Sequence, residues 1–332
     1  TYTATAAQTS FSGAGAEGIT LSYLDSNYVD VYQNGVKLSE ADYTSTSGDT
    51  IVLAETTVSD IIEIVVYDVF SVADTVSKSA GGTFDADVTF ADGADIITAS
   101  AGDDNVRIGV NAGNSITSGG DDNVVIGRDA GTALTTGDEN VAVGFEALKT
   151  EDANGKNTAV GYRSLSTLNA GADSYNTAFG HEAGRDLTTG IRNIYVGGGA
   201  GKLSNDADHN VAIGHASLAN NLKGNNNVAV GSGALQAQNT SSSTDTNNTG
   251  VGFNAGLAVT SGTSNTFIGS EAGLSATTGA ESVAVGMQAL RAEDGHGQNT
   301  AVGMQALEDL NAGATGNNTA VGHIAGRRMT SG

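Results

Sequence analysis

The chain of 332 residues contains no cysteine, no proline and no tryptophan, and 14 lysine and arginine residues stand against 37 aspartate and glutamate residues. The absence of cysteine excludes a disulfide scaffold, a thiolate zinc site and a cysteine nucleophile. The net charge of −23 argues against nucleic acid and anionic membrane surfaces as partners, because both repel an acidic protein. No hydrophobic run approaches the roughly 18–20 residues of a membrane-spanning helix, so we expect no membrane insertion.

Glycine is the residue in excess. The chain has 47 glycines, roughly twice the usual share, while aromatic residues make up only 5%. A conventional core would use more large apolar side chains. This composition favours a repetitive, turn-rich β-fold.

One nine-residue motif recurs thirteen times from Asn105 onward. Each copy has an asparagine (Ser282 in one copy), a β-branched residue, usually an alanine, an aliphatic residue or phenylalanine, a glycine, two variable residues, alanine or serine, and finally glycine or leucine. The motif glycines follow one another at 17 to 21 residues, and the last position reads Gly-Gly-Leu-Leu three times, which gives a second period of about 71 residues. Such self-similarity is typical of a solenoid whose coils bury their faces against one another.

The first half of the motif predicts a short strand, because β-branched residues alternate with a more variable position. We expect the strictly aliphatic positions to face a core, and the tolerant position, which holds Arg107, Tyr195 and Phe267 in three copies, to face solvent or another chain. The glycine after the strand predicts a corner with positive φ or a close backbone approach. The asparagines predict a stacked ladder. The structural positions of the first five copies are Asn105, Gly109, Asn123, Gly127, Asn140, Gly144, Asn157, Gly161, Asn176 and Gly180.

Residues 1–100 differ from the repeats in composition, with 15 acidic and 2 basic residues. Strand-like runs lie at Ile19–Tyr23, Tyr28–Tyr32, Thr50–Leu53 and Asp60–Phe70, and Gln33-Asn34-Gly35 is a hairpin signal. We therefore expect an all-β chain with three parts. Residues 1–72 form a small antiparallel β-sandwich, 73–101 a connector that threads into the shaft, and 102–332 a β-solenoid of thirteen coils of about 17 residues.

Acidic pairs precede the asparagine in the first three copies. In stacked coils these carboxylates would lie about 5 Å apart. One interpretation is a column of calcium sites, because Ca²⁺ takes several carboxylate oxygens; the other is a solvated turn stack screened by salt. No other cofactor is indicated. The calcium candidates are Asp103, Asp104, Asp121, Asp122, Asp138 and Glu139.

The position after each motif glycine is varied and often large. Exposed aromatic and methionine side chains on a rigid scaffold would make a receptor-binding stripe. The alternative, which we favour because exposed apolar rows are a liability without a partner, is a seam between chains. The residues in question are Phe145, Tyr162, His181, His215, Phe253, Met287, Met304 and His323.

Catalytic signatures are missing from the sequence. There is no Gly-x-Ser-x-Gly elbow, no His-x-x-x-His pair and no phosphate-binding loop, and no singular acidic cluster with aromatic platforms suggests polysaccharide hydrolysis. We expect no catalytic residues and no enzymatic activity.

Several short motifs of the chain resemble segments of known protein families. The segment from Tyr2 to Tyr67 resembles a module of bacteriophage tail fibres through QTSF at 8–11, VDVYQNGVKL at 29–38, DY at 42–43 and DIIEIVVY at 60–67. GGTFDADVTF at 81–90 resembles the segment that often follows this module. The Asn-Thr-Ala-Val-Gly repeat is similar to the head repeats of trimeric autotransporter adhesins, although those repeats are shorter.

The resemblance implies a homotrimer of parallel chains, a left-handed β-roll or β-helix, and an extracellular place on a virion tail fibre that attaches to a host receptor such as a glycan. Other virion or appendage proteins would be further partners. The chain stops inside a repeat, so we expect it to belong to a longer fibre. The alternatives are a bacterial surface adhesin or a self-assembling extracellular filament, and third, a polysaccharide depolymerase spike.

Overall fold

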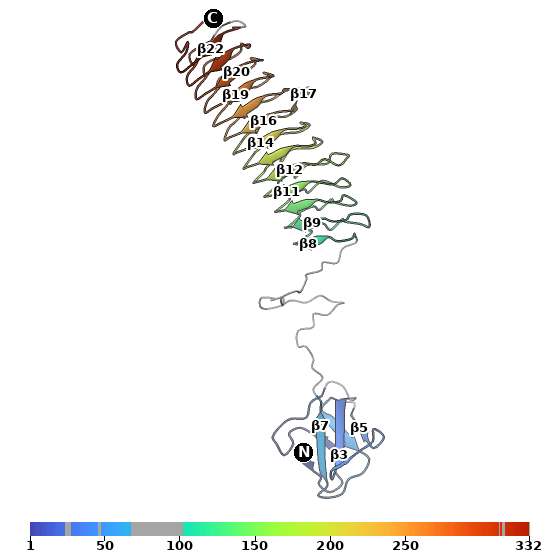
Figure 1. Ribbon diagram of the computed structural model, residues 1–332. Coiled ribbons are helices and arrows are strands. Elements are labelled where there is room, and N and C mark those ends of the chain that lie inside the picture. Colours follow the sequence, from blue (N-terminus) through green and yellow to red (C-terminus); the bar gives the residue numbers. More distant parts are fainter. Residues whose placement is uncertain (24–27, 46–47, 68–101, 312, 314–315, 332) are drawn as a thin grey trace. The chain divides into compact units, whose positions relative to one another are not determined.

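The protein is all-β and falls into two compact units, Thr1–Asp95 and Ile96–Gly332 (Figure 1). The computed structural model describes residues 1–331 apart from 24–27, 46–47, 68–101, 312 and 314–315. The predicted order, small antiparallel sheets followed by a parallel β-solenoid, is confirmed. The predicted connector 73–101 lies outside the described residues.

The first unit consists of two small antiparallel sheets around one core. The first sheet has the order β1 (Tyr2–Thr3), β7 (Ile61–Val66), β3 (Val29–Gln33) and β4 (Val36–Lys37). The second has the order β2 (Ser10–Ser12), β6 (Thr50–Leu53) and β5 (Tyr43–Thr44). Phe11, Ile51 and Ile62 are fully buried where the two sheets meet.

Two sequence predictions in this unit have opposite outcomes. The hairpin is confirmed, because Gln33 pairs with Val36 across Asn34 and Gly35, whose φ values are +51° and +80°. The strand predicted over Ile19–Tyr23 is wrong. That segment forms only an isolated bridge between Ala14 and Thr20, since its alternating Leu21 and Tyr23 reach the core from a loop rather than from a ladder.

The second unit stacks one short strand per coil into a thirteen-stranded parallel sheet, so the thirteen predicted coils are confirmed (Figure 1). Neighbouring strands pair in register, with Ala142 opposite Ala159. A second ladder joins β15 (Gly224–Asn225) to β17 (Thr244–Asp245). The strands of the main sheet are β8 (Val106–Ile108), β9 (Val124–Ile126), β10 (Val141–Val143), β11 (Thr158–Val160), β12 (Thr177–Phe179), β13 (Ile194–Val196), β14 (Val211–Ile213), β16 (Val228–Val230), β18 (Thr249–Val251), β19 (Thr266–Ile268), β20 (Val283–Val285), β21 (Thr300–Val302) and β22 (Thr319–Val321).

The predicted facing of these strands is wrong. The middle residue of the strand points into the coil: Ala142, Tyr195 and Phe267 are all 0% exposed. The β-branched residues on either side, such as Val141 and Val143, are only half-buried and face outward. The interior of a coil is narrow, so an alanine on the strand can fill the space next to the rest of the coil. The alternation of residues defines two faces of the strand but does not say which face meets that interior.

The corners and the ladder behave as predicted. Gly127 has a φ of +128°, and a Cβ built there would lie 2.6 Å from the carbonyl oxygen of Gly144 in the next coil. Only glycine allows the coils to stack this closely. The motif asparagines are buried except for Asn318, which is half-buried. The Asn123 side chain accepts the backbone N–H of Asn140 at 2.9 Å and donates to the Gly137 carbonyl at 2.9 Å.

Leucine at the last motif position fills the interior of six coils. These leucines are at most 1% exposed although their φ values are positive, a conformation that costs a non-glycine residue about 1–2 kcal/mol. Burial of a leucine side chain contributes about 1.5–3 kcal/mol, which offsets that strain. The six are Leu148, Leu165, Leu218, Leu235, Leu290 and Leu307, with φ between +47° and +53°.

Candidate interaction surface

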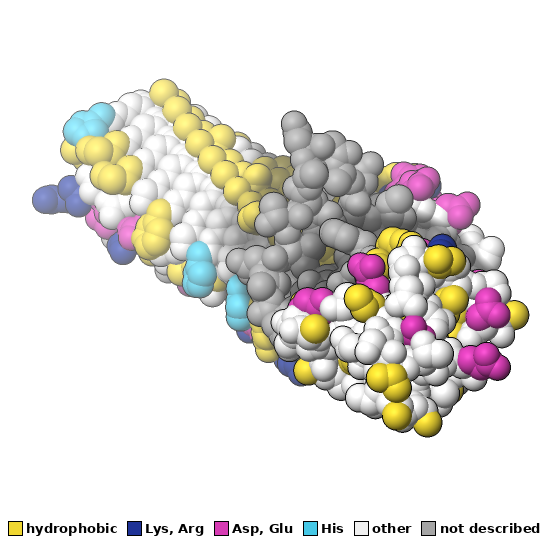
Figure 2. All heavy atoms as spheres, turned by 90° about the horizontal axis from the view of Figure 1, so that it is seen from below, with side chains coloured by type: hydrophobic (Ala, Val, Ile, Leu, Met, Phe, Trp, Pro, Cys, Tyr) yellow, Lys and Arg dark blue, Asp and Glu magenta, His cyan; other side chains and the backbone are white. Residues whose placement is uncertain are grey.

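The outward residues of the thirteen strands form two parallel rows along the solenoid. The first outer row, made by the first residue of each strand, contains valine, isoleucine and threonine. The second outer row, made by the third residue, contains valine, isoleucine and one phenylalanine and no polar residue in any coil. Ile108 and Phe179 of this second row are 49% and 57% exposed. Figure 2 shows hydrophobic side chains following one another in a line along the solenoid.

The two outer rows together form a strip that is apolar along the second row and holds threonine at six of the thirteen positions of the first row; it is called the apolar strip below. Thirteen strands at about 4.8 Å spacing span about 58 Å, and two rows about 6.6 Å apart form a strip about 10 Å wide, thus on the order of 600 Å². A patch of this size is at the upper end of what single chains expose, and such patches are often interaction sites. The strip is also continuous, because the strands are in register from coil to coil.

Aromatic rings stack on one another at the position after the motif glycine. The Arg128 guanidinium lies 4.4 Å from the centre of the Phe145 ring. Phe145 and Tyr162 stack at 5.3 Å between ring centres, and Tyr162 and His181 at 4.8 Å with an angle of 11°. The coil spacing sets these distances. Since both faces of Phe145 and Tyr162 are covered in this way, these two rings offer their edges to an outside ligand.

Most of the predicted row after the motif glycine is exposed on the single chain. Tyr162 and Phe253 are 39% and 53% exposed, and Met287 and Met304 are 46% and 37% exposed. His181, His215 and His323 are exposed as well, and Phe145 is half-buried. The three histidines lie coils apart along the stack and are not brought together. Whether the row is a seam or a receptor stripe stays a prediction.

Ion pairs run beside the ring stack. Glu146 bonds Lys149 at 2.8 Å and Arg163 of the next coil at 2.6 Å, and the hydrogen bond from Lys149 lowers the pKa of the Glu146 carboxyl. Glu182 pairs with Lys202 at 2.7 Å and its pKa is lowered for the same reason. The flank of the stack therefore carries fixed charges of both signs, which suits recognition of a polar ligand.

The acidic pairs bond the backbone between coils. The Asp121 side chain accepts the backbone N–H of Asp103 at 2.7 Å, and the Asp138 side chain accepts that of Asp121 at 2.9 Å. The second members, Asp104, Asp122 and Glu139, have φ values of +52° to +57° and serve the turn. Within the described ranges these six residues form no group of three with ligand atoms close together, and the calcium column stays a prediction.

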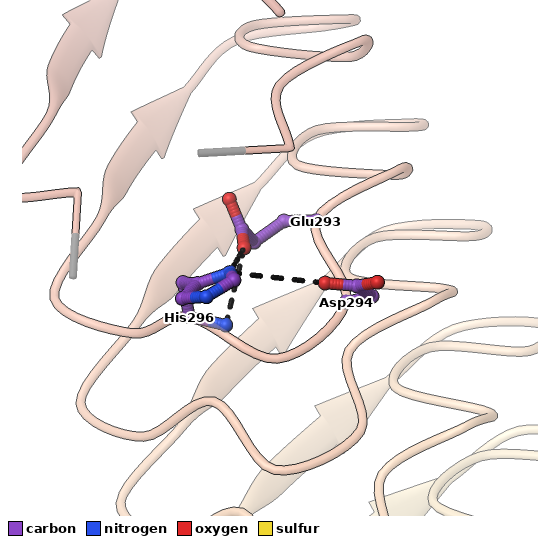
Figure 3. A group of neighbouring side chains, drawn as sticks. All are labelled: Glu293, Asp294 and His296. Carbon is purple, nitrogen blue, oxygen red and sulfur yellow. Dashed lines mark hydrogen bonds and ion pairs between the residues drawn. The ribbon is translucent and has the colours of Figure 1, made fainter. Parts of the chain in front are cut away.

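One group of three ligating side chains does occur in the described part of the chain. Glu293, Asp294 and His296 bring a carboxylate oxygen each and an imidazole nitrogen within 4.8 Å of one another (Figure 3). Sequence reasoning missed this group. The signal that could have found it was the segment EDGHG at 293–297, which replaces EDANG at 151–155 two Gly-Gly-Leu-Leu periods earlier.

No helix in the described residues is long and apolar enough to cross a membrane.

Comparison with known proteins assigns no family to the chain. A comparison of the chain with models of protein families, with curated proteins and with solved structures finds no match. The solenoid, the apolar strip and the charged ring stack are therefore the features from which a function can be inferred.

Proposed function

We propose that this protein is a structural fibre or appendage subunit, a homotrimer of parallel chains that acts in attachment to a host cell, as a phage tail fibre does. The single observation that carries the proposal is the second outer row, which is aliphatic or aromatic in all thirteen coils and yet lies on the outside of the chain. A side-chain pattern kept apolar over the full length of a rigid rod implies a partner of equal length, and a second copy in the same register meets that requirement.

The size of the strip supports association of whole chains. A stable interface buries about 800 Å² per partner. The strip spans on the order of 600 Å², and the flanking side chains add to it.

This proposal revises the seam expected from the sequence. The outer rows, rather than the position after the glycine, carry the uninterrupted apolar pattern, because the latter position also holds Arg128, Gly198, Ser232 and Ser270. With the chains joined through the strip, the ring stack around Tyr162 and its charged flank are the surface left for a receptor, for which a glycan is a suitable chemistry.

Cysteine scanning tests the assembly, since the chain has no native cysteine. Val230→Cys in the second outer row is expected to form interchain disulfides under mild oxidation. Thr167→Cys, on an exposed turn residue, is expected to form none. Equal cross-linking of the two variants contradicts the assignment of the strip as the interface.

Binding to cells tests the attachment. Labelled protein is mixed with a panel of bacterial strains, and we expect saturable binding to a subset of them. The variant Tyr162→Ala is expected to lose that binding while keeping its mass in solution, whereas Thr167→Ala keeps both. Release of reducing ends from the bound polysaccharide would instead identify a depolymerase, and growth of filaments by the purified chain would identify a filament subunit.

A further inference from the structure

The turn at residues 293–296 places two carboxylates around one imidazole nitrogen. His296 Nδ1 lies 3.3 Å from Glu293 Oε1 and 3.8 Å from Asp294 Oδ1, and Figure 3 shows the ring facing both side chains. The Glu293 side chain is 1% exposed, and His296 is 30% exposed. Three donors of two chemical kinds thus converge from four consecutive residues.

The imidazole nitrogen at the centre of this group lacks a hydrogen bond. His296 Nδ1 is buried, and no group in the described chain bonds it with acceptable geometry. The groups nearest to this nitrogen are the two carboxylates, at ion-pair distance. When the ring is neutral with its proton on Nε2, the Nδ1 lone pair points at these negative oxygens. A cation among the three groups accepts electron pairs from all of them.

The matched turn two periods earlier shows what the coil itself requires. There Glu151 is fully buried and accepts the backbone N–H of Asn154 at 3.3 Å, just as Glu293 accepts that of His296 at 3.2 Å. The Asn154 amide donates to Glu151 at 2.8 Å, so this turn is closed by a hydrogen bond. The buried glutamate therefore serves the turn in both coils, and the histidine differs from the asparagine in turning an imidazole nitrogen, a metal-ligating atom, toward the same carboxylate.

We propose that Glu293, Asp294 and His296 bind a divalent first-row transition metal ion, of which Zn²⁺ is the representative, with water completing the coordination. Donors about 2.1 Å from a tetrahedral zinc lie about 3.4 Å apart. The nitrogen–oxygen distances of 3.3 and 3.8 Å match this spacing after a small rotation of the exposed Asp294 side chain.

The donor set selects the kind of ion. Imidazole suits zinc, copper and nickel, whereas calcium and magnesium take oxygen ligands. One histidine and two carboxylates leave an open position for water, as three-ligand zinc sites do. Protons compete with the metal for the imidazole nitrogen, so the affinity falls as the pH is lowered.

Calorimetric titration of the full chain with ZnCl₂ at neutral pH and physiological salt tests the site. We expect saturable binding of one ion per chain that millimolar Ca²⁺ does not displace. His296→Asn, which installs the residue found at 154, is expected to weaken the binding at least about tenfold without a change in the thermal midpoint of the metal-free protein. His215→Asn, on an exposed histidine elsewhere in the stack, is the matched control and is expected to bind like the unmodified chain.

A gain of function completes the test. The double variant Ala153→Gly, Asn154→His gives the earlier turn the same EDGHG segment, and we expect it to bind two ions per chain. Cobalt absorption in the visible range reports the coordination of each site directly. The absence of saturable zinc binding, unchanged binding by His296→Asn, or a single site in the double variant overturns the proposal.

Discussion

The Tyr195 ring occupies the space that a side chain at Gly201 would need. A Cβ built at Gly201 would lie 2.5 Å from the ring, and both residues belong to the same coil. Phe267 and Gly273 repeat the relationship at 2.6 Å. Coils that end the motif in leucine instead carry alanine on the strand, as Ala212 does. In these coils one large side chain fills the interior, supplied either by the strand or by the last motif position, and no coil has a large residue at the strand position together with leucine at the last position.

Substitutions at Tyr195 and Gly201 that move the large side chain from one position to the other should be tolerated only when both are made together. Gly201→Leu alone overfills the coil and is expected to destabilise by about 1–3 kcal/mol. Tyr195→Ala alone leaves a cavity and is expected to cost about 3–5 kcal/mol. The double variant reproduces the alanine–leucine pairing of the neighbouring coil and should recover most of the loss, as measured by urea unfolding. Additive losses would contradict the shared-volume account.

The asparagine ladder has one weak rung. Ser282 replaces asparagine there, and its hydroxyl accepts the Asn299 N–H at 3.3 Å, against 2.9 Å for Asn248 and Asn265. Ser282→Asn should reach the His296 carbonyl as Asn265 reaches Gly279, and raise the free energy of unfolding by about 1 kcal/mol.

The reciprocal change, Asn140→Ser, is the control for the ladder and should lower stability by a similar amount. Thermal melts of both variants provide the measurement. A loss of stability in Ser282→Asn would show that the rung is shaped by the surrounding turn and not by the ladder.

The corner glycines should be far less tolerant than turn glycines with positive φ. Gly127→Ala places a Cβ against the next coil's carbonyl oxygen and is expected to cost about 3 kcal/mol or more. Gly171 has a φ of +72°, and a Cβ added to it would meet no other atom within 4 Å, so its substitution by alanine should cost only about 1–2 kcal/mol. Equal unfolding midpoints for the two variants would contradict close stacking as the reason for glycine.

The stability of the first unit should fall in acid because of Asp60. This buried carboxylate accepts the Thr57 N–H at 2.7 Å and side-chain bonds from Asn34 and Gln33 at 2.8 and 2.7 Å, which hold its pKa well below the usual range. A lowered folded pKa contributes stability above the unfolded value of about 3.9, and the contribution is lost as the pH falls through the folded pKa.

Asp60→Asn should therefore weaken the unit at pH 7 and approach the unmodified chain below about pH 3.9. Amide hydrogen exchange of β3 and β7 reports this unit separately from the solenoid. A difference between the two proteins that persists undiminished in acid would rule out the carboxylate as the cause.

The repeats made the solenoid predictable from the sequence. Thirteen recurrences of asparagine, strand and glycine determine the coil count, the corner at Gly127 and the ladder through Asn123, because each depends on local backbone geometry that the motif encodes. In the first unit, β1 and β5 escaped prediction, since strands of two residues have no periodicity to detect.

The facing of the strands could not be read from the pattern. Alternation defines two faces, but which of them meets the coil interior, where Ala142 lies, depends on how the rest of the coil returns. The site at His296 was missed for a similar reason: its three donors converge only through the turn that Glu293 closes.

The solution mass of the purified chain, measured by light scattering, tests the central claim that the outer strip joins chains. The account predicts three times 33.1 kDa, and a band of that size on an unboiled denaturing gel that shifts on boiling. Val143→Glu combined with Val230→Glu should give single chains that still fold, while Thr167→Glu stays trimeric. A folded chain of 33.1 kDa at micromolar concentration would contradict the account, because the strip would then face water without a partner.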